Sequence, residues 1–375
     1  MITGKSINTI INVLLPVSSR YVGSPRSTIR LGEICDLTKD SISIEYNNQN
    51  SRLFIDRKIS EFFNISELAD SYPFFVVKLL RARVWGRNGA VITQKDQFIT
   101  DVSREFNKGL NIEHSVFYTI KQKKPQIIKG NCAVIGTAGA NIYYHWMMDV
   151  LPRLGIISKQ VSLSEIDYFI TEFNAYTFQV QTFEILNIPL KKIIASNDNW
   201  NFHIEAEQLW VPSLAGPLDQ PTAYQVEYLR ELFKEYICES GGNRRLYISR
   251  RKEGRRTIVN EDSIIAELKK RGFDIVVCEE LTVKEQVKLF SEAQIIIGPH
   301  GSAFTNLVFC KPGTKVLDIF SNSHINPCFW FLSQIRELDY HFMVGSSAPI
   351  DTNPKNDNVV VDMPIFMHLL LELGI

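Results

Sequence analysis

The second half of the chain alternates short apolar runs with longer segments of helical period, and this alternation most restricts the fold. Runs rich in β-branched residues indicate strands, and apolar residues spaced three and four apart indicate helices. We predict strands at 246–249, 273–277, 294–297, 315–320 and 340–344, with helices at 261–271, 283–293 and 327–337 between them. Repeated β-α units of this length predict an α/β fold with a parallel, doubly wound sheet.

Polar residues ahead of two of these helices support the assignment. Asn260 stands where an N-cap residue is expected, and Thr282 with Glu285 has the spacing of a capping box. Both patterns satisfy backbone N–H groups that have no partner inside a helix.

A less regular alternation covers residues 128–211. Strands are predicted at 132–136, 168–171, 193–195 and 208–211, and helices begin at Tyr143 and Tyr176. Residues 1–130 contain strand-like runs at 74–80 and 90–93 but no steady period. The N-terminal part is therefore expected to contain β-structure of irregular topology.

The chain has 375 residues, whereas a single hydrophobic core stops growing at about 250–300. Three prolines and a glycine in 212–221 mark a linker. We predict an N-terminal domain at 1–215, Rossmann-like over 131–215, and a C-terminal Rossmann-like domain at 216–345. The tail at 346–375 ends in a helix, 363–373, that is expected to pack back onto the N-terminal domain.

Composition excludes several classes of protein. The 41 basic and 41 acidic residues balance, so no overall field draws the chain onto nucleic acid or an anionic membrane. The 6 cysteines are scattered without zinc-site spacing, so no metal site is predicted, and reduced thiols in a cytoplasm are the simplest interpretation. The apolar stretch at 7–17 is interrupted by polar residues, so neither a signal peptide nor a membrane anchor is expected. Peripheral attachment to a membrane stays open.

A glycine-rich turn follows the strand at 294–297. Gly298 and Gly301 allow the backbone to approach a ligand, and the N–H groups of Gly301, Ser302 and Ala303 open the following helix. His300 in this turn can donate to a phosphate oxygen, or it can be a turn histidine bonded to nearby backbone. Because open α/β sheets bind ligands beyond the carboxyl ends of their strands, we predict a diphosphate site here.

Five basic residues follow the strand at 246–249, and its carboxyl end lies at the same edge of the sheet. They are Arg250, Arg251, Lys252, Arg255 and Arg256. A basic run is usually a solvated loop, so we expect only Arg250 and Arg256 to face the diphosphate and the rest to be solvated.

His145 and Asp149 are four residues apart and so share one helical face. Such a pair can be a base with the group that orients it, or a purely structural pair.

Four motifs in order resemble the glycosyltransferase 61 family, which includes animal O-linked GlcNAc and O-mannose-glycan transferases, plant xylan-decorating transferases and bacterial polysaccharide enzymes. The first three motifs are His145-Trp146-x-x-Asp149-x-Leu151-Pro152-Arg153-Leu154, Ser249-Arg250, and Arg256-x-x-x-Asn260-Glu261. The fourth is Gly298-x-His300-Gly301-x-x-x-Thr305-Asn306, followed by Pro312-Gly313.

This resemblance implies a GT-B fold, in which two Rossmann-like domains face each other across a cleft, with the acceptor side N-terminal and the nucleotide sugar C-terminal. It also implies inverting chemistry without a required metal or other cofactor. By position, Asp149 becomes the candidate general base and His145 its orienting partner or a donor-sugar contact, and the division of roles within the pair stays open. The implied donor-binding residues are Arg250, Arg256, Asn260, Gly298, His300, Gly301, Ser302, Ala303, Asn306 and Asp318.

Two positions depart from the family pattern. Asp318 stands where the family usually carries Glu, and its carboxylate is a candidate acceptor for ribose hydroxyls or a surface group. Ala303 stands where Gly is common.

The partners expected from the resemblance are a nucleotide-diphosphate sugar, with uridine as the family-level base, and a glycan or lipid-linked glycan acceptor in bacterial surface polysaccharide synthesis. A cytoplasmic enzyme, peripheral at the inner face of the membrane, fits that role. Two alternatives stay open: a nucleotide-sugar 2-epimerase of the same architecture, and a non-catalytic glycan-binding scaffold. A dinucleotide oxidoreductase is disfavoured because no Gly-x-Gly-x-x-Gly follows a predicted strand.

Overall fold

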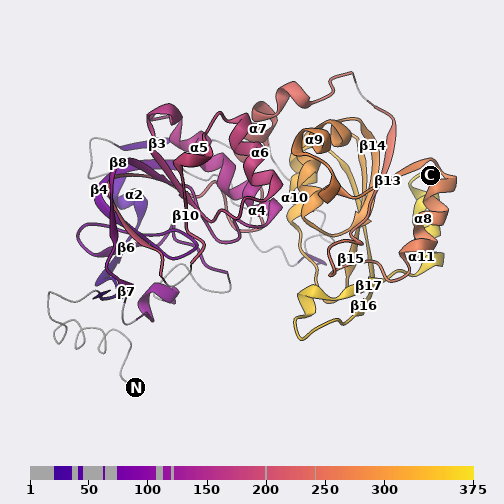
Figure 1. The fold of residues 1–375 in the computed structure, drawn as a ribbon. Coiled ribbons are helices and arrows are strands. Elements are labelled where there is room, and N and C mark those ends of the chain that lie inside the picture. Colours follow the sequence, from indigo (N-terminus) through magenta and orange to yellow (C-terminus); the bar gives the residue numbers. More distant parts are fainter. Residues whose placement is uncertain are drawn as a thin grey trace. The chain divides into compact units, whose positions relative to one another are not determined.

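The computed structural model describes residues 21–35, 41–44, 62–63, 74–106, 113–119, 122–198, 201–240 and 242–375. The chain divides into two compact units (Figure 1). Unit 1 comprises Met1–Asn47 and Ser71–Gly216, and unit 2 comprises Asn48–Asp70 and Pro217–Ile375. The predicted α/β class is confirmed, since both units combine strands and helices.

Unit 1 is built on a mixed sheet with strand order β10-β9-β8-β11-β4-β5-β6-β2, and β3 also pairs with β4. The strands are β2 (Ser27–Ile29), β3 (Ser41–Ile44), β4 (Phe74–Trp85), β5 (Ala90–Ile92), β6 (Gln97–Ile99), β8 (Gln126–Val134), β9 (Tyr168–Thr171), β10 (Ile193–Ala195) and β11 (His203–Pro212). A separate ribbon pairs β1 (Tyr21–Val22) with β7 (Gln122–Lys123).

Strands β10, β9, β8 and β11 of unit 1 are parallel to one another, whereas β11 and β4 are antiparallel. In chain order the parallel part reads 3-2-1-4, as in one half of a Rossmann fold. The chain reverses direction across the sheet between β8 and β11, which makes their carboxyl ends the topological switch point. Apolar residues that share one face of this sheet, including Val134, Ile170 and Leu209, form a core.

The helices of unit 1 follow its parallel strands. They are α2 (Leu31–Cys35), α4 (Tyr143–His145), α5 (Leu151–Ile157) and α6 (Thr177–Ile185), with short 3₁₀ turns η1 (Ser115–Phe117), η3 (Leu163–Glu165) and η4 (Leu190–Lys192). Between α4 and α5 the helix widens into a π turn, η2 (Trp146–Val150), where the N–H of Leu151 bonds the carbonyl of Trp146 five residues earlier. Pro152 in the first turn of α5 has no N–H to donate to the preceding turn, which gives a physical reason for the widening.

Unit 2 contains a six-stranded sheet with order β13-β12-β14-β15-β16-β17. The strands are β12 (Arg244–Ile248), β13 (Phe273–Val276), β14 (Ala293–Pro299), β15 (Lys315–Ser321), β16 (Asp339–Ala348) and β17 (Asn358–Val360). All neighbouring pairs are parallel except β16 and β17, so the predicted parallel, doubly wound sheet is confirmed. Its order 2-1-3-4-5 places the switch point between β12 and β14.

Helices alternate with these strands (Figure 1). They are α7 (Ala223–Leu232), α8 (Glu261–Lys270), α9 (Val283–Ser291), α10 (Cys328–Ile335) and α11 (Met363–Glu372), with 3₁₀ segments η5 (Lys234–Tyr236), η6 (Cys278–Glu280), η7 (Ser302–Phe309) and η8 (Pro354–Asn356). The capping box of Thr282 and Glu285 is confirmed at the start of α9. Asn260 occupies the N-cap position of α8 as predicted, but its side chain makes no cap hydrogen bond there.

The C-terminal helix differs from expectation. Phe366, Leu370 and Leu373 lie in the core of unit 2 together with Ile264 and Leu268 of α8. The apolar face of α11 is thus covered within unit 2, and the predicted packing onto the N-terminal domain is wrong. The reason is that β17 first pairs with β16, which fixes α11 beside this sheet.

An N-terminal segment also belongs to unit 2 instead of the predicted N-terminal domain. Phe62 stacks on Phe342 with 4.4 Å between ring centroids. Phe63 is buried with Phe320 and Trp330. The aromatic cluster beside β15 and β16 is therefore completed by residues far away in sequence. No local sequence pattern predicts this packing.

Within the described residues, no helix is both long and apolar enough to cross a membrane. The same part of the chain contains no group of three or more His, Cys, Asp or Glu side chains arranged to hold a metal ion. Its five described cysteine thiols are unpaired.

Candidate functional site

The switch point of unit 2 brings together the two sequence elements predicted to bind a diphosphate. β12 and β14 are parallel neighbours, so Arg250 and the Gly298–Gly301 turn leave the sheet at the same edge. A Cβ atom on Gly298 would lie 2.8 Å from the carbonyl oxygen of Ile248, and one on Gly301 would overlap the Arg250 guanidinium. A larger residue at either position would therefore collide with the surrounding atoms unless they moved.

Arg250 and Arg256 supply positive charge that nearby carboxylates neutralise only in part. Arg250 is 4% exposed, its Nε has no partner among the described residues, and its nearest carboxylate, Glu253, is 3.6 Å away. Burial lowers the pKa of Arg250. Burial, and next the charge of Arg250, lower the pKa of Arg256 to about 10. Since a charge taken out of water is costly unless it is paired, the buried Arg250 and the half-buried Arg256 together favour an anionic ligand.

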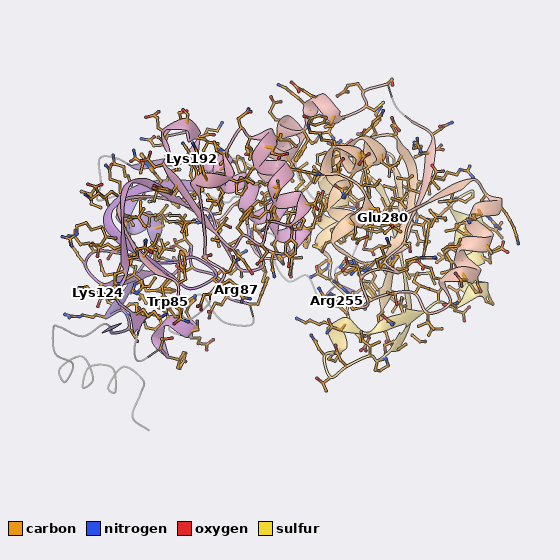
Figure 2. All side chains as sticks on the ribbon, in the orientation of Figure 1. Trp85, Arg87, Lys124, Lys192, Arg255 and Glu280 are labelled. Carbon is orange, nitrogen blue, oxygen red and sulfur yellow. The ribbon has the colours of Figure 1, made fainter. Side chains whose placement is uncertain are left out.

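The other three basic residues of the loop are exposed. Arg251 forms an ion pair with Glu261, Lys252 with Glu280, and Arg255 lies at the surface of unit 2 (Figure 2). The structure thus separates Arg250 and Arg256 from their neighbours. Arg256 has a left-handed backbone, with φ of 51°, and its N–H bonds the carbonyl of Asn356 at 3.1 Å, which fixes its position against the C-terminal segment.

His300 is held by a buried carboxylate. Its Nδ1 lies 2.9 Å from Oδ2 of Asp318, and the hydroxyl of Tyr340 donates to the same oxygen at 2.8 Å. With Nδ1–H directed at Asp318, Nε2 is the ring nitrogen left for a ligand. Asp318 is completely buried, so the predicted contact with ribose hydroxyls is wrong in this structure: its carboxylate orients His300 instead.

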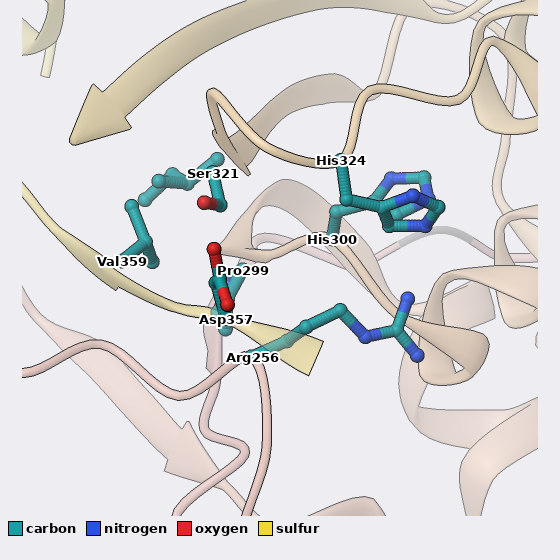
Figure 3. Close-up of a pocket in the computed structure, with 8 residues that line it drawn as sticks. Arg256, Pro299, His300, Ser321, His324, Asp357 and Val359 are labelled. Atoms are coloured by element: carbon teal, nitrogen blue, oxygen red, sulfur yellow. The ribbon is translucent and has the colours of Figure 1, made fainter. Parts of the chain in front are cut away.

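A small pocket of about 10 Å³, enough for one water-sized group, opens beside His300 (Figure 3). Arg256 and His300 line it, as do Pro299 and Ile319 at the ends of β14 and β15. The remaining lining residues are Ser321, His324, Asp357 and Val359.

Ser302 and Ala303 begin η7, which is a 3₁₀ helix where the sequence predicted an ordinary helix. Both residues are half-buried, and Gly301 before them offers no side-chain cap. The N–H groups of a first helical turn have no acceptor within the helix, so they can donate to an anion beside Arg250.

The second candidate site lies in unit 1, at the π turn. Nδ1 of His145 is 2.7 Å from Oδ2 of Asp149, and both residues are buried. The other carboxylate oxygen, Oδ1, lies 3.8 Å from Nη1 of Arg104. Because both oxygens of Asp149 face cations or donors, Nε2 of His145 is the better placed atom to accept a proton. π turns are rare and often occur at functional sites.

Arg153 stabilises the backbone around the His145–Asp149 pair. Its side chain is completely buried and donates to the carbonyl of Gly136 at 2.5 Å and to that of Pro212 at 3.0 Å. These carbonyls follow β8 and end β11, so Arg153 ties together the two strand ends of the switch point in unit 1. Close packing continues at Gly139, where a Cβ would lie 2.6 Å from Cδ2 of His145.

Comparison with known proteins identifies the family. The sequence profile of the family described as Glycosyltransferase 61 matches residues 143–317. The chain carries a glycosyltransferase 61 domain. The predicted resemblance is therefore confirmed, and the matched region contains both the His145–Asp149 pair and the Arg250–His300 site.

Individual relatives of the glycosyltransferase 61 domain agree. A β-1,2-xylosyltransferase of Oryza sativa subsp. japonica is 41% identical over 61 residues, 16% of this chain and 11% of its own length. A β-1,2-xylosyltransferase of Arabidopsis thaliana is 32% identical over 78 residues, 20% of this chain and 15% of its own. The EGF domain-specific O-linked N-acetylglucosamine transferase of Mus musculus is 26% identical over 146 residues, 35% of this chain and 28% of its own. The similarity spans less than a third of each relative.

Two predicted donor-binding residues of the glycosyltransferase 61 domain have structural roles instead. Asn306 is completely buried and donates to Oε1 of Gln286 at 2.8 Å and to the carbonyl of Ala303 at 3.0 Å. Asn260 exchanges hydrogen bonds with the backbone of Val361, at 2.8 and 3.0 Å. Both side chains bond other segments of unit 2, and neither lines the pocket beside His300.

Several residues near these sites were not predicted. Arg104 lies in the part of the sequence without a period, and Tyr340 was assigned only to a strand. Of the residues that line the pocket, Ser321 ends β15, His324 follows that strand, and Asp357 immediately precedes β17. A polar residue at the end of a parallel strand is a detectable signal for Ser321, whereas nothing local marks the others.

Proposed function

We propose that this glycosyltransferase 61 domain protein transfers a sugar from a nucleotide-diphosphate donor, a UDP-sugar first of all, to a glycan or lipid-linked glycan acceptor. The observation that carries the proposal is the buried guanidinium group of Arg250 beside the half-buried one of Arg256, at the switch point of unit 2, each with a buried Nε that lacks a partner among the described residues. A diphosphate supplies the missing negative charge, and the Gly301 turn lets it approach the backbone.

Stabilising the leaving diphosphate is the main task of such a site. A charge-assisted hydrogen bond contributes about 1.5–3 kcal/mol and a helix N-terminus about 0.3–1 kcal/mol. Arg250, Arg256 and His300 together therefore outweigh the amides of η7. We propose that these groups take the place of a metal ion at the leaving group, so that catalysis persists in EDTA.

We assign proton removal to His145. In this mechanism the acceptor hydroxyl gives its proton to Nε2 of His145 while its oxygen forms the bond to the anomeric carbon. The bond from that carbon to the diphosphate oxygen breaks, and its electron pair leaves with the diphosphate. One displacement of this kind inverts the anomeric centre. Asp149 orients His145 and stabilises the imidazolium, with Arg104 holding the far carboxylate oxygen.

The relatives suggest which donors to test first. Their printed names describe xylosyltransferases and an N-acetylglucosamine transferase. UDP-xylose and UDP-N-acetylglucosamine are accordingly the first candidates. The GT-B arrangement, the cytoplasmic location with peripheral membrane attachment, and the role in bacterial surface polysaccharide synthesis remain predictions.

Nucleotide binding tests the proposal directly. Purified protein is titrated by calorimetry and thermal shift with UDP, GDP, CMP and ADP in EDTA, and wild type is compared with Arg250→Ala. Arg255→Ala is the matched control, since Arg255 belongs to the same loop but is exposed. Saturable binding of one nucleotide that Arg250→Ala abolishes and Arg255→Ala retains supports a donor site. Absence of binding by every nucleotide contradicts it, and the scaffold alternative then becomes the better one.

Catalysis needs a separate readout. Incubation with UDP-xylose or UDP-N-acetylglucosamine in the absence of acceptor is followed by NMR. An isomerised sugar or acceptor-independent stoichiometric loss of nucleotide would point to the 2-epimerase alternative, whereas a transferase leaves most of the donor intact until an acceptor is added.

A further inference from the structure

The pocket beside His300 contains polar groups that the diphosphate does not use. Ser321, His324 and Asp357 line it together with Arg256 (Figure 3). All of these residues belong to unit 2. Its enclosed space of about 10 Å³ holds one water-sized group, so the pocket can receive hydroxyl groups of a ligand that lies across its opening but cannot enclose a whole ring.

Among the residues that line the pocket, Asp357 gives the clearest indication of the kind of ligand. It is 5% exposed, its Oδ1 is buried without a partner, and no described residue bonds its carboxylate. An unpaired buried carboxylate costs stability, so its presence beside a pocket indicates a ligand that donates hydrogen bonds.

The position of Asp357 is fixed by its neighbours in the chain. The N–H of Arg256 donates to the carbonyl of Asn356 at 3.1 Å, and the N–H of Thr257 donates to Oδ1 of Asn358 at 3.0 Å. These bonds place Asp357 beside Arg256, yet the two side chains form no ion pair in the described structure. Figure 3 shows the guanidinium of Arg256 directed toward His300 and His324, whereas the carboxylate of Asp357 is directed toward Ser321.

The charges around the pocket exclude two kinds of ligand. A phosphate would be repelled by the carboxylate of Asp357, and a cation would be repelled by the guanidinium of Arg256. The imidazole of His324 lies 5.8 Å from that of His300, centroid to centroid, and burial followed by the charges of His300 and Arg256 lowers its pKa to about 3. His324 is therefore neutral at ordinary pH, which suits an uncharged ligand.

We infer that the Ser321–His324–Asp357 pocket binds a vicinal diol of the donor, next to the diphosphate held by Arg250 and Arg256. The carboxylate accepts from the two hydroxyls, while Ser321 and His324 provide a further donor or acceptor each. This inference rests on the proposed function. The diol belongs to either the ribose of the nucleotide or the transferred sugar, and the two sources differ in which ligands sense the pocket.

The test compares Asp357→Asn with wild type by calorimetry against pyrophosphate, UDP, 2′-deoxy-UDP, UDP-xylose and UDP-N-acetylglucosamine. Asp262→Asn is the matched control, because its carboxylate on α8 is fully exposed. We expect Asp357→Asn to bind pyrophosphate at least as well as wild type. Ligands whose diol occupies the pocket should bind about tenfold to a hundredfold more weakly, the loss of a charge-assisted hydrogen bond.

The ligand series separates the two sources. If the ribose occupies the pocket, UDP weakens with its sugar conjugates, and 2′-deoxy-UDP binds the variant and wild type alike. If the sugar occupies it, UDP is unaffected and only the conjugates weaken. Equal weakening of pyrophosphate, or no change with any ligand, overturns the inference while leaving the donor site intact. A wild type that binds pyrophosphate but none of the nucleotides contradicts the proposed function itself, and this inference falls with it.

Stability supplies a second readout. Since Asp357→Asn removes an unpaired buried charge, the melting temperature of the unliganded variant should stay the same or rise. A clear fall would show that the carboxylate is structural and would overturn the inference. If Asp357→Asn does not fold, Ser321→Ala answers the same question with the same ligands. A wild type that binds not even pyrophosphate contradicts the proposed function, and this inference falls with it.

Discussion

The two units present the same pair of side chains in different surroundings. In unit 1, Nδ1 of His145 lies 2.7 Å from Asp149, and in unit 2, Nδ1 of His300 lies 2.9 Å from Asp318. Both histidines lie beyond the carboxyl end of a parallel strand at a switch point, His145 after a loop and His300 directly after β14. Because a carboxylate occupies Nδ1 in each pair, Nε2 is the ring nitrogen that can contact a ligand or accept a proton.

What lies around each pair differs. Asp149 is backed by the cation Arg104, whereas Asp318 is backed by the hydroxyl of Tyr340. His145 packs against the ring of Phe106, while His300 shares its pocket with Arg256. Cations around His300 suit it to a phosphate, and the absence of a described cation in contact with the His145 ring suits that ring to accepting a proton. The residues around each histidine–carboxylate pair therefore decide whether its histidine is suited to bind a phosphate or to accept a proton.

The largest effect should come from His145→Gln. General-base catalysis contributes about 100- to 10,000-fold, so we expect turnover to fall by that factor with donor affinity within about threefold of wild type. Release of UDP from the donor selected by the binding screen measures turnover, and calorimetry measures affinity. If Asp149→Asn abolished turnover while His145→Gln retained it, Asp149 would be the base and our division of roles would be reversed.

The next effect concerns the contact between Gly301 and Arg250. Arg250→Ala should weaken nucleotide binding about a hundredfold, since more than one charge-assisted bond is lost. Gly301→Ala should have a comparable effect because its methyl group displaces the same guanidinium. A double-mutant cycle measured by calorimetry provides the control: in the Arg250→Ala background, Gly301→Ala should add little. Additive losses would mean that the Gly301 turn acts on binding independently of Arg250 and not by displacing its guanidinium.

His203 is a buried histidine whose ring bonds a backbone carbonyl instead of a carboxylate, and it should affect the pH dependence of stability. Burial lowers the pKa of His203 to about 4, with an opposing contribution from its bond to the carbonyl of Lys123. The unfolded chain therefore binds this proton more readily, and the stabilising contribution is complete above about pH 6.5 and is lost as the pH falls toward 4. The maximum loss is about 3 kcal/mol.

Urea unfolding of wild type and His203→Gln at pH 7.5, 6 and 5 measures this effect. The free energy of unfolding of wild type should fall by more than that of the variant over this range. Parallel pH dependences would show that His203 stays neutral in both states and would remove it from the comparison.

The smallest effect is expected for Tyr340→Phe, which removes one of the two hydrogen bonds to Oδ2 of Asp318. A single bond of this kind contributes about 1 kcal/mol, so nucleotide affinity should fall about fivefold, with turnover at saturating donor unchanged. Tyr247→Phe is the matched control, since its hydroxyl donates to Glu261 at 3.0 Å away from the pocket. If both variants lost affinity equally, the effect would be general destabilisation and not orientation of His300.

Local sequence patterns were sufficient for the scaffold of unit 2 and for part of its site. Strand and helix periods predicted the β-α alternation, and Thr282 with Glu285 predicted a cap that the structure contains. Since parallel strands end at one edge, the sequence also placed Arg250 and His300 together. These features depend on residues a few positions apart and on a general rule of sheet topology.

Only the tertiary structure decided which polar groups face a ligand. Asn306 and Asp318 stand in the predicted motif but are buried beneath it, and Asp357 reaches the pocket because its segment pairs with one roughly a hundred residues earlier. The burial of a side chain is set by whatever distant segment packs on it, which no period encodes. The sequence therefore determined the strands, their turns and the family, whereas long-range packing determined the pocket, the π turn and the partners of each histidine.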